Sequence, residues 1–236
     1  MNNMQTVEPF TRIYQRACER KAGALALEAL LSNCASAEDI AVIPDNLLLG
    51  ELTKKVFQSG FVWRVVRQKW PGFCDVFFDF NIEKILLMSD EMLEEKARDV
   101  RIIRNANKVF TVRHNALMIH DLALEHGSFA RFIANWPTEN IIGLWAYLKQ
   151  HGARLGGNTG PYALRAIGKD TFILSTDVEA YLRASKVFDG GITSKRSLAQ
   201  IQQQFNVWQQ QSNRSLQQIS QIIAFSVGDN YVGMLQ

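Results

Sequence analysis

Apolar side chains recur at helical spacing along most of this chain, and capping residues stand where helices would begin. Between residues 101 and 126, apolar positions such as Ile102, Val109 and Ile119 form one broad stripe, which Gly127 ends. Ser89 precedes a run of acids, and both features favour the start of a helix. The pattern predicts helices over residues 45–59, 89–95, 101–126, 128–133, 140–150, 159–167, 176–185, 194–211 and 215–225. The one strand-like stretch, residues 171–174, is too short and isolated for a sheet, so the predicted fold class is all-α.

The composition is that of a globular protein. Hydrophobic residues make up 47% of the 236 residues and charged residues 21%, which excludes disordered and low-complexity classes. No apolar run approaches the roughly 18 residues of a membrane span, and the first residues lack the features of a secretory signal. Three widely spaced cysteines, Cys18, Cys34 and Cys74, supply neither a disulfide framework nor a four-cysteine metal site. We therefore expect a reduced protein of the bacterial cytosol with no membrane partner.

Charge is unevenly distributed along the chain. The formal net charge is only +3, too small to indicate a nucleic-acid partner. However, residues 51–70, 101–115 and 149–169 are rich in Lys and Arg, whereas residues 75–99 are acidic. The basic segments either converge on one face of the fold or form ordinary solvated helix faces, and charge alone leaves both interpretations open.

A glycine-rich turn separates two of the predicted helices. The segment 154–165 reads Arg-Leu-Gly-Gly-Asn-Thr-Gly-Pro-Tyr-Ala-Leu-Arg. Glycines let the backbone approach a ligand closely, and the amides at the start of the next helix favour an anion. Arg154 and Arg165 flank the turn and would suit a phosphate. The alternative is a plain tight turn between two helices.

The succession of this turn, a helix, a loop and then Asp177 resembles the signature of the helix-hairpin-helix DNA glycosylase superfamily. The resemblance implies that a hairpin grips DNA phosphate through backbone amides and that Asp177 faces the sugar of an extruded nucleotide. The superfamily's lyases carry a lysine where this chain has Asn158, so the chain resembles a monofunctional glycosylase that uses water. The implied hairpin consists of Leu155, Gly156, Gly157, Asn158, Thr159 and Gly160.

Two further segments narrow the resemblance to the 3-methyladenine DNA glycosylase I family. Residues 57–63, Phe-Gln-Ser-Gly-Phe-Val-Trp, resemble that family's Gln-Ala-Gly-Leu-Ser-Trp. Residues 101–105, Arg-Ile-Ile-Arg-Asn, resemble its Gly-Ile-Ile-Arg-(Asn/His). The resemblance implies two helical lobes flanking a cleft, with residues 1–45 and the C-terminal helices in one lobe and about 46–185 carrying the pocket and hairpin.

This chain also departs from the family in two respects. Its histidines are internal and no cysteine follows Cys74, so neither the zinc site of many members nor any other metal or cofactor is expected. The family places a glutamate that holds the damaged base eight residues before the tryptophan, where this chain has Lys55. Glu51 lies one helical turn earlier on the same face, and Lys55 and Glu51 are both candidates for the base pocket. A lysine would repel a cationic 3-methyladenine, which leaves the substrate range open.

Individual residues carry competing interpretations. Trp63 is the best candidate for stacking on a flipped base, because an aromatic face attracts a cationic alkylpurine. Asp177 would stabilise an oxocarbenium-like sugar or position water, or it would merely cap the helix that it opens. The remaining candidates for the base pocket, each with core packing or burial as the alternative, are Phe57, Gln58, Phe61 and Tyr162.

The sequence thus predicts a monomeric repair enzyme that flips an alkylated purine out of duplex DNA and hydrolyses its glycosidic bond. The alternative is a non-catalytic helix-hairpin-helix protein that binds damaged or distorted DNA, for which a carboxylate facing the sugar would have no purpose. An iron–sulfur lyase is excluded because three scattered cysteines cannot supply a four-cysteine cluster.

Overall fold

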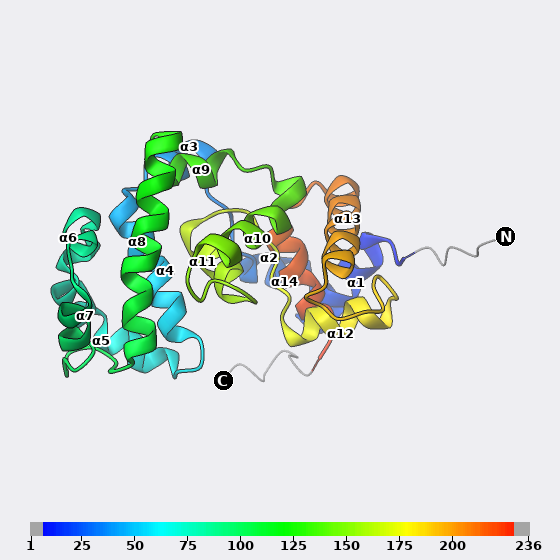
Figure 1. The fold of residues 1–236 in the computed structure, drawn as a ribbon. Coiled ribbons are helices and arrows are strands. Elements are labelled where there is room, and N and C mark those ends of the chain that lie inside the picture. Colours follow the sequence, from blue (N-terminus) through cyan, green and yellow to red (C-terminus); the bar gives the residue numbers. More distant parts are fainter. Residues whose placement is uncertain (1–6, 229–236) are drawn as a thin grey trace. The chain divides into compact units, whose positions relative to one another are not determined.

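A computed structural model describes residues 7–228, and over this range the chain is helical without a strand. This confirms the predicted all-α class (Figure 1). Contacts divide the chain into two compact units. Among the described residues, the first unit contains residues 7–34, Pro137–Ile142 and residues 170–228; the second contains Ala35–Trp136 and Gly143–Lys169. The sequence analysis placed about residues 46–185 together in the part that carries the pocket and hairpin, and this division into lobes stays a prediction.

The first unit is built around α14 (Leu216–Ser226), which packs against α1 (Phe10–Arg20), α12 (Thr176–Ala184) and α13 (Lys195–Ser212). The short helices α2 (Ala24–Leu30) and η2 (Thr138–Asn140) complete it. Its core contains Phe172, stacked at 4.2 Å between ring centroids on Phe205, which in turn contacts Trp208. The Asp170 carboxylate accepts hydrogen bonds from the backbone amides of Leu216 and Gln217 and so fixes the start of α14.

The second unit is built around α4 (Asp45–Gln58), which packs against the long helix α8 (Ala106–His126) and against α11 (Thr159–Ile167) (Figure 1). Its core is aromatic: Phe57 meets Phe73 edge to face, and Trp70 stacks between Phe73 and Phe80. The other elements of this unit are α3 (Ala37–Ala41), α5 (Trp63–Val76), η1 (Phe78–Phe80), α6 (Ile82–Leu86), α7 (Asp90–Lys96), α9 (Phe129–Asn135) and most of α10 (Ile141–His151).

Serine caps begin many of these helices, as the sequence indicated. In each case the hydroxyl accepts a hydrogen bond from the backbone amide three residues later, which satisfies an amide that the helix itself leaves without a partner. The capping serines are Ser36, Ser89, Ser128, Ser175, Ser194 and Ser215. Within the described range, no helix is long and apolar enough to cross a lipid bilayer.

The predicted helix over residues 101–126 is wrong at its start. Residues 101–104 are not helical, and α8 begins at Ala106 because the Asn105 side chain caps it by accepting from the Lys108 amide at 3.1 Å. Helix α5 was not predicted, and it contains Pro71. The next residue, Gly72, lies so close to the backbone of Arg101 that a Cβ atom would approach its carbonyl oxygen to 2.5 Å.

Candidate active site

The glycine-rich turn connects α10 to α11 within the second unit, in the arrangement of a helical hairpin. The turn closes through a hydrogen bond from the Gly160 amide to the Leu155 carbonyl oxygen, at 3.1 Å. Asn115 on α8 holds the entry to the turn, because its side-chain oxygen accepts from the Ala153 amide at 2.7 Å and its amino group donates to the Ala153 carbonyl. The Leu155 side chain is buried, so at this position only the backbone could contact a ligand.

Glycine is present in and beside this turn for two different structural reasons. A Cβ atom at Gly160 would lie 2.6 Å from the Leu155 carbonyl oxygen, and one at Gly152 would lie 2.7 Å from the Leu148 carbonyl oxygen. Both positions therefore require glycine for close packing. Gly157 instead has a φ of +59°, with open space where a side chain would project. Gly157 and Asn158 are exposed, so the tip of the hairpin presents backbone to solvent.

A pocket of about 400 Å³ lies beside this hairpin, a volume within the range of small-molecule sites. Its aromatic wall consists of Trp63, which is 45% exposed, and Tyr162, whose ring meets that of Trp63 edge to face at 5.9 Å. The remaining lining residues come from the end of α4, the loop after it and the hairpin: Lys55, Gln58, Ser59, Gly60, Gly156, Gly157, Asn158 and Thr159. We call this space the hairpin pocket.

Two polar side chains from the last turn of α4 line the hairpin pocket. The Lys55 ammonium lies over the Trp63 ring, 5.5 Å from its centroid, and burial lowers the pKa of Lys55 from its usual value. Gln58 is only 5% exposed, and its side-chain oxygen has no hydrogen-bond partner among the described residues. A buried acceptor without a partner is costly, so a ligand that donates a hydrogen bond would be favoured here.

Three residues predicted for the base pocket lie elsewhere in the second unit. Phe57 is fully buried in the aromatic core, where its ring meets that of Phe73 on α5 and lies 5.8 Å from the ammonium of Lys108 on α8. Phe61 is partly exposed and lies under the ammonium of Lys108, at 4.6 Å from the ring centroid. Glu51 lines a different cavity. The structure therefore brings Lys55, Gln58, Trp63 and Tyr162 together with the hairpin, but not these three.

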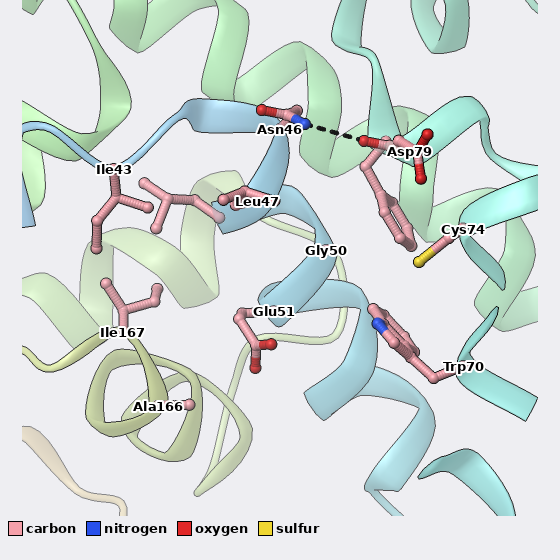
Figure 2. A pocket seen from close by; sticks show the side chains of 12 residues that line it. Ile43, Asn46, Leu47, Gly50, Glu51, Trp70, Cys74, Asp79, Ala166 and Ile167 are labelled. Atoms are coloured by element: carbon pink, nitrogen blue, oxygen red, sulfur yellow. Dashed lines mark hydrogen bonds between the residues drawn. The ribbon is translucent and has the colours of Figure 1, made fainter. Parts of the chain in front are cut away.

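That second cavity, of about 320 Å³, is formed by α4, α5, η1 and α11. Figure 2 shows Glu51 between a wall that contains Ile43 and Ile167 and the indole of Trp70 on the other side. The Glu51 carboxylate pairs with the Lys54 ammonium, which itself lies 4.4 Å from the centre of the Trp70 ring. Lys54 thus neutralises this acid, and no residue of the hairpin tip lines the cavity.

Lys108 holds the segment of the chain that carries Gln58 in place beside the hairpin pocket. Nothing in the sequence pattern indicated this role. Its side chain is buried, and its ammonium donates hydrogen bonds to the carbonyl oxygens of Val56 (2.7 Å), Phe57 and Ser59. These carbonyls close the C-terminal end of α4, where the helix dipole favours a cation. Lys108 therefore fixes the chain immediately before and after Gln58.

Asp177 belongs to the first unit, in the first turn of α12. Ser175, not Asp177, caps this helix, since its hydroxyl accepts from the Val178 amide at 3.3 Å. The Asp177 carboxylate instead faces the backbone of Gly228: a Cβ atom on that glycine would lie 2.7 Å from the nearer carboxylate oxygen.

The two arginines that flank the hairpin differ in exposure. Arg154 is exposed and has a left-handed φ of 59°, whereas Arg165 is half-buried on α11.

Across residues 7–228, the structure has no group of three or more His, Cys, Asp or Glu side chains arranged to hold a metal ion.

Comparison with known proteins places these features in a family. The model of a family described as methyladenine glycosylase matches residues 40–163, which include every residue of the hairpin pocket but not Asp177. Curated proteins give no match. A variant of 3-methyladenine DNA glycosylase I solved in complex with 3-methyladenine is 19% identical, covers 65% of this chain and 90% of its own, and superposes with a TM-score of 0.50.

A second solved structure, 3-methyladenine DNA glycosylase I from Staphylococcus aureus, is 18% identical over 68% of this chain and 95% of its own, with a TM-score of 0.49. The likeness to the 3-methyladenine complex shows the all-α glycosylase fold. The family model matches more than half of the 236 residues. This chain therefore belongs to the methyladenine glycosylase family.

Proposed function

We propose that this protein is a monofunctional DNA glycosylase that flips an alkylated purine, of the 3-methyladenine type, out of duplex DNA. It then hydrolyses the N-glycosidic bond and leaves an abasic site. One observation carries the proposal: the exposed backbone of the hairpin and the partly exposed ring of Trp63 line the same pocket. A hairpin that binds backbone phosphate would thereby hold the duplex where an extruded base reaches an aromatic surface.

The hairpin pocket offers a purine both stacking and hydrogen bonding. Trp63 and Tyr162 provide aromatic surface, on which an extruded base is stabilised by about 1–3 kcal/mol. The unpartnered side-chain oxygen of Gln58 is an acceptor, which suits the exocyclic amino group of an adenine. A guanine would present a carbonyl oxygen at the same position, which the Gln58 oxygen cannot bind in the orientation that the side chain has here.

The chemistry requires little beyond this pocket. An N3- or N7-alkylated purine is already cationic in DNA, so its departure as a neutral base needs no strong general acid. We propose that Asp177 stabilises the cationic sugar or positions the attacking water. The side chain at the position of the lyase lysine is Asn158, which has no amine to form a covalent intermediate, and this supports hydrolysis by water.

The proposal includes the setting in which the enzyme acts. Its substrate is double-stranded DNA that contains alkylated bases, and it works as a monomer without a cofactor in the bacterial cytosol. Cys18, Cys34 and Cys74 form no disulfide with one another, which is compatible with a reducing compartment.

The test is a base-release assay. Duplex DNA methylated by an alkylating agent is incubated with purified protein, and the released bases are separated by chromatography. We expect 3-methyladenine to appear faster than in the same DNA without protein, together with abasic sites. Binding to the methylated duplex without release of any base would instead favour the alternative, a non-catalytic DNA-binding protein.

A further inference from the structure

Lys55 gives the hairpin pocket a charge that is unusual for a site that receives a cation. Among the described residues that line this pocket, Lys55 is the one that is charged at neutral pH, and no carboxylate lines it. The acid one turn earlier on the same helix, Glu51, pairs with Lys54 and lines the other cavity. Glu51 acts on the Lys55 ammonium through its charge but forms no ion pair with it, so no acid within the pocket neutralises Lys55.

The position of this ammonium brings it close to any base that stacks in the pocket. It lies over the Trp63 ring, 5.5 Å from the centroid, so a purine that uses that ring as a stacking surface shares it with Lys55. The side chain is half-buried, and burial is the main cause of its lowered pKa. Water screens a half-buried charge less well than an exposed one, so the interaction with a bound cation is strong.

We propose that the Lys55 ammonium drives the departure of the base, by repelling a cationic purine in the bound substrate and not repelling the neutral purine that leaves. This inference rests on the proposed function, and it makes Lys55 a catalytic residue that contacts the base.

The charge balance of the reaction explains why the repulsion is relieved. The bond between C1′ of the sugar and the purine nitrogen breaks, and its electron pair goes to the purine ring. The ring thereby loses its positive charge, while a positive charge develops on C1′ and the ring oxygen of the sugar. Water then adds to C1′ and releases a proton to the solvent. Lys55 therefore destabilises the bound substrate more than the transition state, and this raises the rate at which the bound substrate loses its base.

Lys55 also fits the neutral product. Free 3-methyladenine retains ring nitrogens with lone pairs, and an ammonium group donates hydrogen bonds to such acceptors. We expect free 3-methyladenine to inhibit the wild-type enzyme, and to inhibit it less when Lys55 is replaced.

The test separates binding from the chemical step. Single-turnover excision of 3-methyladenine from a methylated duplex is measured at increasing enzyme concentrations, which yields a half-saturating concentration and a maximal rate. For Lys55→Met, which removes the charge and keeps an unbranched side chain, we expect both to fall by about tenfold. Lys55→Arg keeps the charge and is expected to retain the wild-type values within about threefold.

The control is Lys84→Met, which removes the same charge from an exposed position on α6 that does not line the pocket. It is expected to leave both quantities unchanged. Circular dichroism of each variant verifies the fold before kinetics.

Several outcomes would overturn the inference while leaving the proposed function intact, provided that the wild type releases base. One is a Lys55→Met enzyme that binds methylated duplex more weakly at an unchanged maximal rate, since Lys55 would then hold DNA. A second is a variant with wild-type kinetics. A third is a borohydride-trapped covalent adduct that Lys55→Met abolishes, since Lys55 would then be a nucleophile. If the wild type itself releases no base, the proposed function fails.

Discussion

Replacing Gly160 with alanine tests whether the hairpin depends on close backbone packing. The added Cβ atom would lie 2.6 Å from the Leu155 carbonyl oxygen, whereas ordinary contacts begin near 3.4 Å. The turn must therefore open by several tenths of an ångström, which costs about 1–3 kcal/mol as overpacking. Loss of the hydrogen bond between the Gly160 amide and that oxygen adds about 1 kcal/mol. Alanine recovers about 1 kcal/mol of helix propensity in the first turn of α11. The net expectation is a loss of about 2 kcal/mol in the free energy of unfolding.

Gly156→Ala is the matched control in the same turn. Its Cβ atom would meet only the flexible side chain of Lys149, at 3.2 Å, and its φ is not positive. We expect a change of less than about 0.5 kcal/mol, because the restricted unfolded chain offsets the small displacement. Urea unfolding followed by circular dichroism and tryptophan fluorescence measures both variants. A Gly160→Ala protein as stable as the Gly156→Ala protein would refute the packing argument.

Three other replacements test further parts of the account. Lys108→Met leaves the C-terminal carbonyls of α4 without their buried donor and is expected to cost about 2–4 kcal/mol in urea unfolding; a loss under 1 kcal/mol would contradict its supporting role. Asp177→Asn should slow single-turnover excision by a factor on the order of ten to a thousand and change stability by less than about 1 kcal/mol, since Ser175 caps the helix; wild-type excision would assign Asp177 a merely structural role. The pKa of Glu8 is lowered chiefly by its hydrogen bonds from Arg16, so its stabilising effect is full above about pH 4.5 and is lost as the pH falls through the lowered value. The stability difference between wild type and Glu8→Gln should accordingly be largest at neutral pH and shrink towards pH 3, and a difference that is constant with pH would exclude this ionisation as its source.

Helices with strong local signals were predictable from the sequence. Residues 159–167 were predicted and observed as a helix, and the starts that Ser89, Ser194 and Ser215 mark are confirmed. A cap is a local feature, because the serine and the amide that it satisfies lie three residues apart. Such a signal needs no knowledge of the tertiary fold.

Helix α5 and the turn after it were not predictable, because their causes are tertiary. Pro71 and Gly72 are typical of a break in a helix, yet α5 continues through both residues. Glycine is required at position 72 because the backbone of Arg101 approaches it closely. The residues that follow, Phe78, Asp79 and Phe80, all have positive φ values between 50° and 58°. Residues other than glycine rarely adopt this backbone conformation, so no local preference predicts it.

The sequence predicted which segments form the candidate site. It did not predict which side chains of those segments point into the pocket. The approach of Trp63 to the hairpin and to Tyr162 follows from the family resemblance. Phe57 and Gln58 are adjacent, yet Phe57 points into the core and only Gln58 lines the pocket, because successive helical residues project about 100° apart. The support from Lys108 spans some fifty residues of sequence and has no local signal.

The central claim is that a damaged base is excised after it enters the hairpin pocket. The most direct measurement is single-turnover release of 3-methyladenine from a methylated duplex by the wild type and by Trp63→Ala, with circular dichroism to verify the fold of the variant. Trp63 is partly exposed, so its replacement removes stacking surface from the pocket at little cost to the core. We predict release by the wild type well above the rate without protein, and release by Trp63→Ala that is slower by about tenfold or more at subsaturating enzyme. Equal release by both proteins would show that the base is excised elsewhere and would contradict the account.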